Sequence, residues 1–275
     1  MAPALEVPAA FATGLAVGLL SALAGIGGGV LMVPFLYLVY APTGVTLSAQ
    51  TVVAHATSLG VAFVTSGIGT WRYALARAIA WRAAAAYALP GILSAFIVAR
   101  MLTRANAAQW VRVGFGVFLM ISALDMARRA RQAPRELPAE SASHSWWWLA
   151  GLGFVGGGLS ALLGIGGGLI SVPALLYVGR LPVKAVAPTA LAGVCLTTLS
   201  GGLGYLTAGP GPAVSGWMAG FMDLRMLLPL SLGAAVTVPV GVRVNRISSP
   251  PTLYWSFSAI FAVVAVSILW TSLRG

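Results

Sequence analysis

Long apolar stretches, separated by short polar ones, run through almost the whole of this chain of 275 residues. A transmembrane helix needs about 20 predominantly apolar residues. Eight segments reach that length, namely 9–39, 49–71, 79–100, 106–127, 146–178, 184–207, 224–245 and 252–271. This pattern predicts an all-α, polytopic integral membrane protein with about eight transmembrane segments.

Two of these segments are too long for a simple crossing, and both carry the same interruption. Residues 18–39 and 157–178 are related by an offset of 139 and are identical at 14 of 22 positions. Each contains Gly-Ile-Gly-Gly-Gly followed by Val-Pro. Glycine costs roughly 1 kcal/mol against alanine in a helix, and proline lacks the N–H that closes a helical turn. We therefore predict two discontinuous helices, each unwound at its glycines and resuming in a second half that ends near Val-Pro.

The repeated motif divides the chain into two homologous halves. Residues 1–127 form the first transmembrane repeat and residues 146–275 the second, with the polar residues 128–145 as a linker between them. The distribution of basic residues does not fix the membrane orientation. Four crossings in each half would make the repeats parallel, whereas a break that turns the chain back would make them inverted.

Composition narrows the class of protein further. Hydrophobic residues make up 59% of the chain, charged residues 8%, and the mean hydropathy is +0.93, whereas a soluble domain carries about 25% charged residues. The net charge of +11 is spread singly between apolar spans, so we expect no nucleic-acid partner. The single cysteine, Cys195, excludes an intrachain disulfide. The spans show no paired carboxylates, metal-ligand cluster or nucleophile–base spacing. We expect no enzyme activity, cofactor or metal.

The glycine breaks themselves are the strongest candidates for a binding site. An unwound turn frees backbone N–H groups, and the helix that follows presents a positive N-terminus. Because the spans contain almost no carboxylate to hold a cation, we predict a small oxyanion such as sulfite, a sulfonate or a carboxylate. The predicted ligands are Gly27, Gly28, Gly29, Gly166, Gly167 and Gly168. The alternative is that the glycines serve only close helix packing, the use expected for Gly14, Gly18, Gly153 and Gly157.

Polar side chains follow each broken segment. A weaker repeat, at an offset of 132, pairs Thr57 with Thr189 and Tyr73 with Tyr205. We predict that Thr57, Ser58 and Thr189 add hydroxyl donors to the anion site, although most hydroxyls in membrane helices bond backbone carbonyls or neighbouring helices.

Two residues of the second predicted span are candidates for coupling transport to protons. His55 is the one histidine within a predicted span, and a histidine can titrate near neutral pH. Gln50 is the second candidate. A hydrogen-bonded histidine that only packs helices together is the alternative for His55.

These motifs resemble a known family. The doubled Gly-Ile-Gly-Gly-Gly-x-x-x-Val-Pro segments, each followed by a threonine-containing helix, are similar to those of the sulfite exporter TauE/SafE family, also called the toluene sulfonate uptake permease family. The resemblance covers essentially the whole chain. It implies a multi-pass secondary carrier of the bacterial inner (cell) membrane that moves sulfite, organosulfonates or related organic anions, often outward and driven by the proton gradient. The family's Thr-Ser-Leu stretch is kept at residues 57–59, but residues 189–191 are Thr-Ala-Leu, which argues against a symmetric role for a second serine.

Three functions stay open at this point. The first is a secondary transporter whose partners are the lipid bilayer, a small anionic substrate and protons. The others are an anion channel and a non-transporting membrane scaffold. The sequence leaves open the substrate, the direction of transport, the coupling ion and the oligomeric state, for which a homodimer is one alternative.

Overall fold

A computed structural model of the chain describes residues 3–103, 109–131, 146–212 and 214–274, and most of them are helical. The first half contains five helices: α1 (Pro3–Ala24), α2 (Gly29–Tyr40), α3 (Leu47–Leu75), α4 (Trp81–Leu102) and α5 (Gln109–Arg131). The predicted linker, residues 128–145, is described only up to the end of α5 at Arg131, and the rest of it lies outside the described residues.

The second half repeats this order. Its helices are α6 (Trp146–Leu163), α7 (Gly168–Pro173) continued by a π-helix (Ala174–Val178), α8 (Val183–Leu206), α9 (Leu224–Ile247) and α10 (Pro250–Arg274). A short antiparallel hairpin of β1 (Met218–Ala219) and β2 (Met222–Asp223) precedes α9. Six helices, α1, α3, α4, α6, α8 and α9, are long and apolar enough to cross a membrane. The predicted all-α architecture is confirmed, while the number of crossings stays a prediction.

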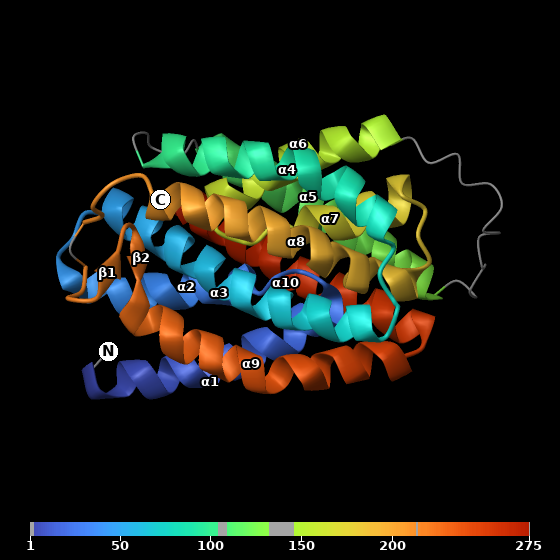
Figure 1. Ribbon diagram of the computed structural model, residues 1–275, viewed down its shortest axis with the longest axis horizontal. Helices are drawn as coiled ribbons and strands as arrows, with labels where there is room; N and C mark the ends of the chain where they lie inside the picture. Colours follow the sequence, from blue (N-terminus) through green and yellow to red (C-terminus); the bar gives the residue numbers. More distant parts are fainter. Residues whose placement is uncertain (1–2, 104–108, 132–145, 213, 275) are drawn as a thin grey trace.

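The helices are arranged with an approximate two-fold symmetry. In Figure 1, α1 and α9 lie side by side along one edge, α4 and α6 lie along the opposite edge, and α3 and α8 run between them. Exchanging the two halves converts the α1–α9 pair into the α6–α4 pair. It converts the α3–α8 and α5–α10 pairs into themselves.

Glycines allow the edge pairs to pack backbone against backbone. A side chain on Gly14 or Gly18 of α1 would collide with carbonyl oxygens of α9, and one on Gly153 or Gly157 of α6 with carbonyl oxygens of α4. The packing role predicted for these four glycines is confirmed. It is the small-residue contact by which membrane helices approach closely.

Both long segments are interrupted at the glycines, as predicted. Three glycines of each break adopt the left-handed conformation that other residues avoid: Gly25, Gly27 and Gly28 in the first break, and Gly164, Gly166 and Gly167 in the second. The chain turns back at each break. A Cβ built on Gly28 would lie 2.5 Å from Val17 Cγ1, although an unbroken helix would separate these two residues by about 16 Å.

This reversal favours the inverted arrangement of the two halves. A hairpin that returns to its starting side, followed by three helices, makes the two repeats enter the bundle from opposite ends. Figure 1 agrees, since α1 begins at one end of the molecule and α6 at the other.

The prediction that the second half-helices end near Val-Pro was wrong for the first break. There α2 continues through Pro34 to Tyr40. Proline removes a single backbone hydrogen bond, and residues beyond it, such as Leu36 and Val39, are buried. In the second break α7 does end at Pro173, and the backbone widens into the π-helix.

The two breaks cross each other in an antiparallel register at the centre of the bundle. A side chain on Gly29 would collide with the backbone of Gly164 and Ile165. Around the symmetry axis, a Cβ on Gly27 would lie 3.7 Å from Gly166 Cα. The contact equivalent to that of Gly29 places Gly168 against the backbone of Gly25 and Ile26. The core of the protein is therefore a direct contact between two unwound segments.

We predict that Gly29→Ala and Gly168→Ala each destabilise the protein by about 1–3 kcal/mol, because overpacking displaces backbone that cannot yield easily. The measurement is the thermal midpoint of the purified protein in detergent. Gly151→Ala is the matched control, since Gly151 lies in α6, is exposed and has no atom within 4 Å of an added Cβ. Equal midpoints for all three variants would contradict the antiparallel contact.

Candidate functional site

Each break is covered by a helix of the other half. The α3 residue His55 packs its Cα and Cβ against Gly164 of the second break, and the α8 residue Ala187 packs against Gly25 of the first. An offset of 132 relates His55 to Ala187, so these two contacts are equivalent. The break residues Gly25 to Gly29 and Gly164 to Gly168 are all buried.

Buried tyrosines satisfy backbone carbonyls just before each break. The Tyr73 hydroxyl donates to the Ala22 carbonyl at 2.8 Å, and the Tyr205 hydroxyl donates to the Ala161 carbonyl at 3.0 Å. Both pairs obey the two repeat offsets. A buried carbonyl at a helix end needs such a partner, so these tyrosines fix the ends of α1 and α6 where they meet the breaks.

Two further side chains donate to carbonyl groups at the breaks. The Ser58 hydroxyl on α3 donates to the carbonyl of Gly164. The Asn245 amide on α9 donates to the Leu23 carbonyl at 2.7 Å. Four carbonyl groups at or just before the breaks thus receive hydrogen bonds from side chains of three different helices.

The donor side of the breaks is not supplied in the same way. The backbone N–H groups of Gly27, Gly28 and Gly29, and those of Gly166, Gly167 and Gly168, make no hydrogen bond to any residue that the structure describes. A buried N–H without a partner costs about 1–3 kcal/mol. The carbonyls of Gly25, Ile26, Gly27, Ile165 and Gly166 likewise accept no hydrogen bond from a residue that the structure describes. Both donors and acceptors are therefore left unpaired at the crossing.

Two of the three predicted hydroxyls lie elsewhere. Thr57 Oγ1 accepts a hydrogen bond from the Asp223 amide at 2.9 Å, and Thr189 Oγ1 accepts one from the Ala80 amide at 3.1 Å. Thr57 and Ser58 are consecutive on α3 and point about 100° apart, so only Ser58 reaches a break. Ser58 donates its one hydroxyl proton to the Gly164 carbonyl. This side chain therefore positions the break.

The structure separates the two candidates for proton coupling. His55 is buried, its Nε2 lies 3.0 Å from the Tyr37 hydroxyl, and it contacts the second break. Gln50 lies near the start of α3 and donates to the Val45 carbonyl at 2.7 Å, so the structure does not bring it to either break.

A buried carboxylate was missed by the sequence-based prediction. Asp223 is fully buried and accepts hydrogen bonds from the Tyr40 and Ser215 hydroxyls and from the Arg225 amide. It is the N-cap of α9, a role that an Asp before a helical segment signals. Glu6 on α1 pairs with Arg225 at 3.0 Å. Among the described residues there is no cluster of three or more His, Cys, Asp or Glu that could hold a metal ion.

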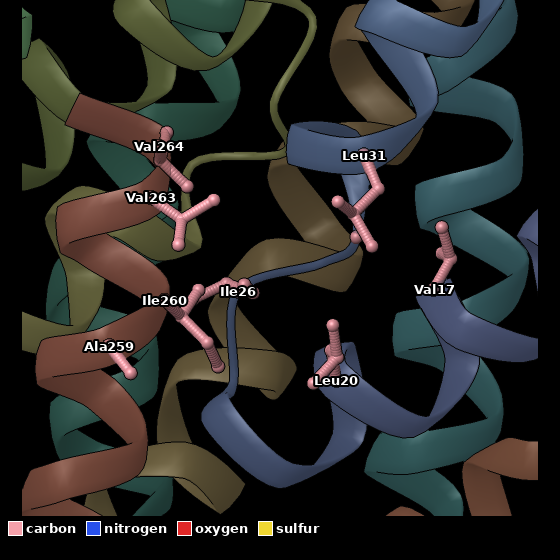
Figure 2. A pocket seen from close by; sticks show the side chains of 9 residues that line it. Val17, Leu20, Ile26, Leu31, Ala259, Ile260, Val263 and Val264 are labelled. Carbon is pink, nitrogen blue, oxygen red and sulfur yellow. The ribbon is translucent and has the colours of Figure 1, made fainter. Parts of the chain in front are cut away.

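A hollow of about 180 Å³ borders the first break. Figure 2 shows the unwound chain at Ile26 between α1 and α2, facing side chains of α10. The hollow is lined by Val17, Leu20, Ile26, Gly28, Leu31, Ala259, Ile260, Val263 and Val264. The hollow exposes only apolar surface, so in this conformation it presents no hydrogen-bond donor to an anion.

Comparison with known proteins identifies the family. The model of the sulfite exporter TauE/SafE family matches residues 10–268. A probable membrane transporter protein of Methanocaldococcus jannaschii is 27% identical over 96% of both chains. One of Bacillus subtilis is 23% identical over 94% of this chain and 95% of its own. No solved structure matches the chain significantly. The chain is a multi-pass membrane protein and belongs to the TauE/SafE sulfite exporter family of membrane transporters.

Proposed function

We propose that this protein is a secondary transporter of small oxyanions, such as sulfite, organosulfonates or related organic anions, across the bacterial inner membrane. Its family and the names of its relatives, probable membrane transporter proteins, support the class of function. The chemistry of the substrate is inferred from the crossing of the two breaks.

The unpaired N–H groups of the breaks carry the proposal. Six glycine amides are without a partner in the described chain, and four carbonyls at or just before the breaks receive donors from tyrosine, serine and asparagine side chains. A site with spare donors favours an acceptor, and an oxyanion is the strongest acceptor among small solutes. The N-terminus of α2 adds a positive partial charge at Gly28 and Gly29.

The inverted repeats supply a route to alternating access. Transporters of this design move one set of helices against another around a fixed site at the repeat interface. Here that interface is the antiparallel contact of the breaks. Rocking α3 and α8 across it would expose the same amides to each side of the membrane in turn.

Counterflow in proteoliposomes tests the transporter against its alternatives. We expect labelled sulfite or methanesulfonate to accumulate against an internal pool of the same anion, with saturation at millimolar concentration or below. A channel would not concentrate the label, and a scaffold would not move it. Either result would exclude the proposed carrier.

We predict that Gly28→Ala and Gly167→Ala lower the counterflow rate at least about tenfold, while the protein still inserts. The added methyl group would lie 2.5 Å from Val17 Cγ1 in the first variant and 3.2 Å from Ser160 Cβ in the second, on the residues that carry the unpaired amides. The left-handed backbone adds about 1–2 kcal/mol of strain.

Gly44→Ala is the matched control for that strain. Gly44 has a φ of 71°, is exposed, and has no atom within 4 Å of an added Cβ. We expect this variant to transport at the wild-type rate. If all three variants transport equally, the glycine amides do not bind the substrate.

We further propose that His55 couples the anion to a proton, because a charged imidazole beside Gly164 would stabilise an anion at the second break. His55→Gln should keep counterflow within about threefold of wild type and lose accumulation driven by an imposed pH gradient. Gln50→Ala is the control and should retain both activities. Undiminished gradient-driven uptake by His55→Gln would exclude this role.

A further inference from the structure

Two buried serines occupy equivalent positions beside the breaks. Ser21 and Ser160 are related by the same offset of 139 as the glycine motifs, and each lies four residues before the first glycine of its motif. Their exposed fractions are 0% and 2%. Neither hydroxyl has a hydrogen-bond partner among the residues that the structure describes.

Both serines face the glycine that begins the second half of their hairpin. A Cβ on Gly28 would lie 3.6 Å from Ser21 Cβ. A Cβ on Gly167 would lie 3.2 Å from Ser160 Cβ and 3.4 Å from Ser160 Oγ. Gly28 and Gly167 are among the residues whose amides lack a partner, so in each half an unpaired serine lies beside a glycine with an unpaired amide.

Other hydroxyls of the bundle show what an ordinary membrane serine or threonine does. Thr65, Ser66 and Thr198 donate to carbonyls four residues earlier on their own helices, at 2.6 to 2.8 Å. Ser94 and Ser200 donate to carbonyls of neighbouring helices. A serine can satisfy itself in this way at little cost. The two break serines do not, and the same exception occurs in both repeats. Among the described residues the hydroxyls of Thr70 and Ser231 also lack a partner, but only Ser21 and Ser160 are equivalent under the repeat.

We propose that the hydroxyls of Ser21 and Ser160 are side-chain ligands of the transported anion, one in each of two symmetry-related half-sites. The inference rests on the proposed function and adds the side chains that recognise the substrate. Each half-site combines one O–H donor with the amides around Gly28 or Gly167. Donors arriving from two directions suit an anion with two or more oxygens on one centre, such as sulfite, a sulfonate or a carboxylate. They suit a halide less well.

The test uses Ser21→Ala, Ser160→Ala and the double variant of the full chain. We expect the KM for methanesulfonate counterflow to rise about tenfold in each single variant, the effect of losing one charge-assisted hydrogen bond. In the double variant, 10 mM methanesulfonate should no longer raise the thermal midpoint, whereas it raises that of the wild type. Chloride at the same concentration should shift neither midpoint.

Ser66→Ala is the matched control, since Ser66 is equally buried but its hydroxyl donates to the Ala62 carbonyl at 2.6 Å. We expect its KM to stay within about twofold of wild type and its ligand-free midpoint to fall. Removing the unpartnered hydroxyls of Ser21 and Ser160 should leave the ligand-free midpoint unchanged or raise it. This contrast separates a ligand from a structural hydrogen bond.

Two outcomes overturn the assignment and leave the proposed function intact. The first is a wild-type KM in both single variants, and the second is a ligand-free midpoint that falls in both as it does in Ser66→Ala. Absence of counterflow and of any ligand-induced shift in the wild type would overturn the proposed function itself, and the serine assignment with it.

Discussion

The direct contact between two unwound backbone segments is the constraint on which the rest of this structure depends. Inside a bilayer no solvent satisfies exposed peptide groups, so broken helices are tolerated only where protein or a bound solute supplies partners. The chain supplies donors for the carbonyls through Tyr73, Tyr205, Ser58 and Asn245. The glycine amides of the same segments have no partner among the residues that the structure describes.

The two-fold relation explains why the contact is possible. Gly29 and Gly168 let each hairpin fit against the other. Because the register is antiparallel, the two copies of the motif make equivalent contacts. The symmetry is broken in the helices that cover the breaks. His55 and Ser58 cover the second break, whereas Ala187 covers the first and the position equivalent to Ser58 is Ala190. A symmetric backbone frame thus carries an asymmetric set of polar side chains.

The candidate site was only partly predictable. Glycine breaks are visible in a sequence because helix propensity is a property of single residues, and a repeat makes them unmistakable. Thr57 and Thr189 were assigned to the breaks because they lie near them along the chain, yet they bond Asp223 and Ala80. Ser21 lies inside the repeated segment but was not predicted as a ligand, since a serine in a membrane helix usually bonds its own backbone.

The sequence by itself determined the membrane class, the two homologous halves and the places where two helices must unwind. All three follow from hydropathy, repetition and glycine content, which act over a few residues. Only the tertiary structure decided that the chain turns back at the breaks, that the breaks touch, and which hydroxyl faces which glycine. These facts depend on the rotation of helices about their axes and on contacts between residues more than 100 positions apart, such as Ser58 and Gly164, and local preferences do not encode them.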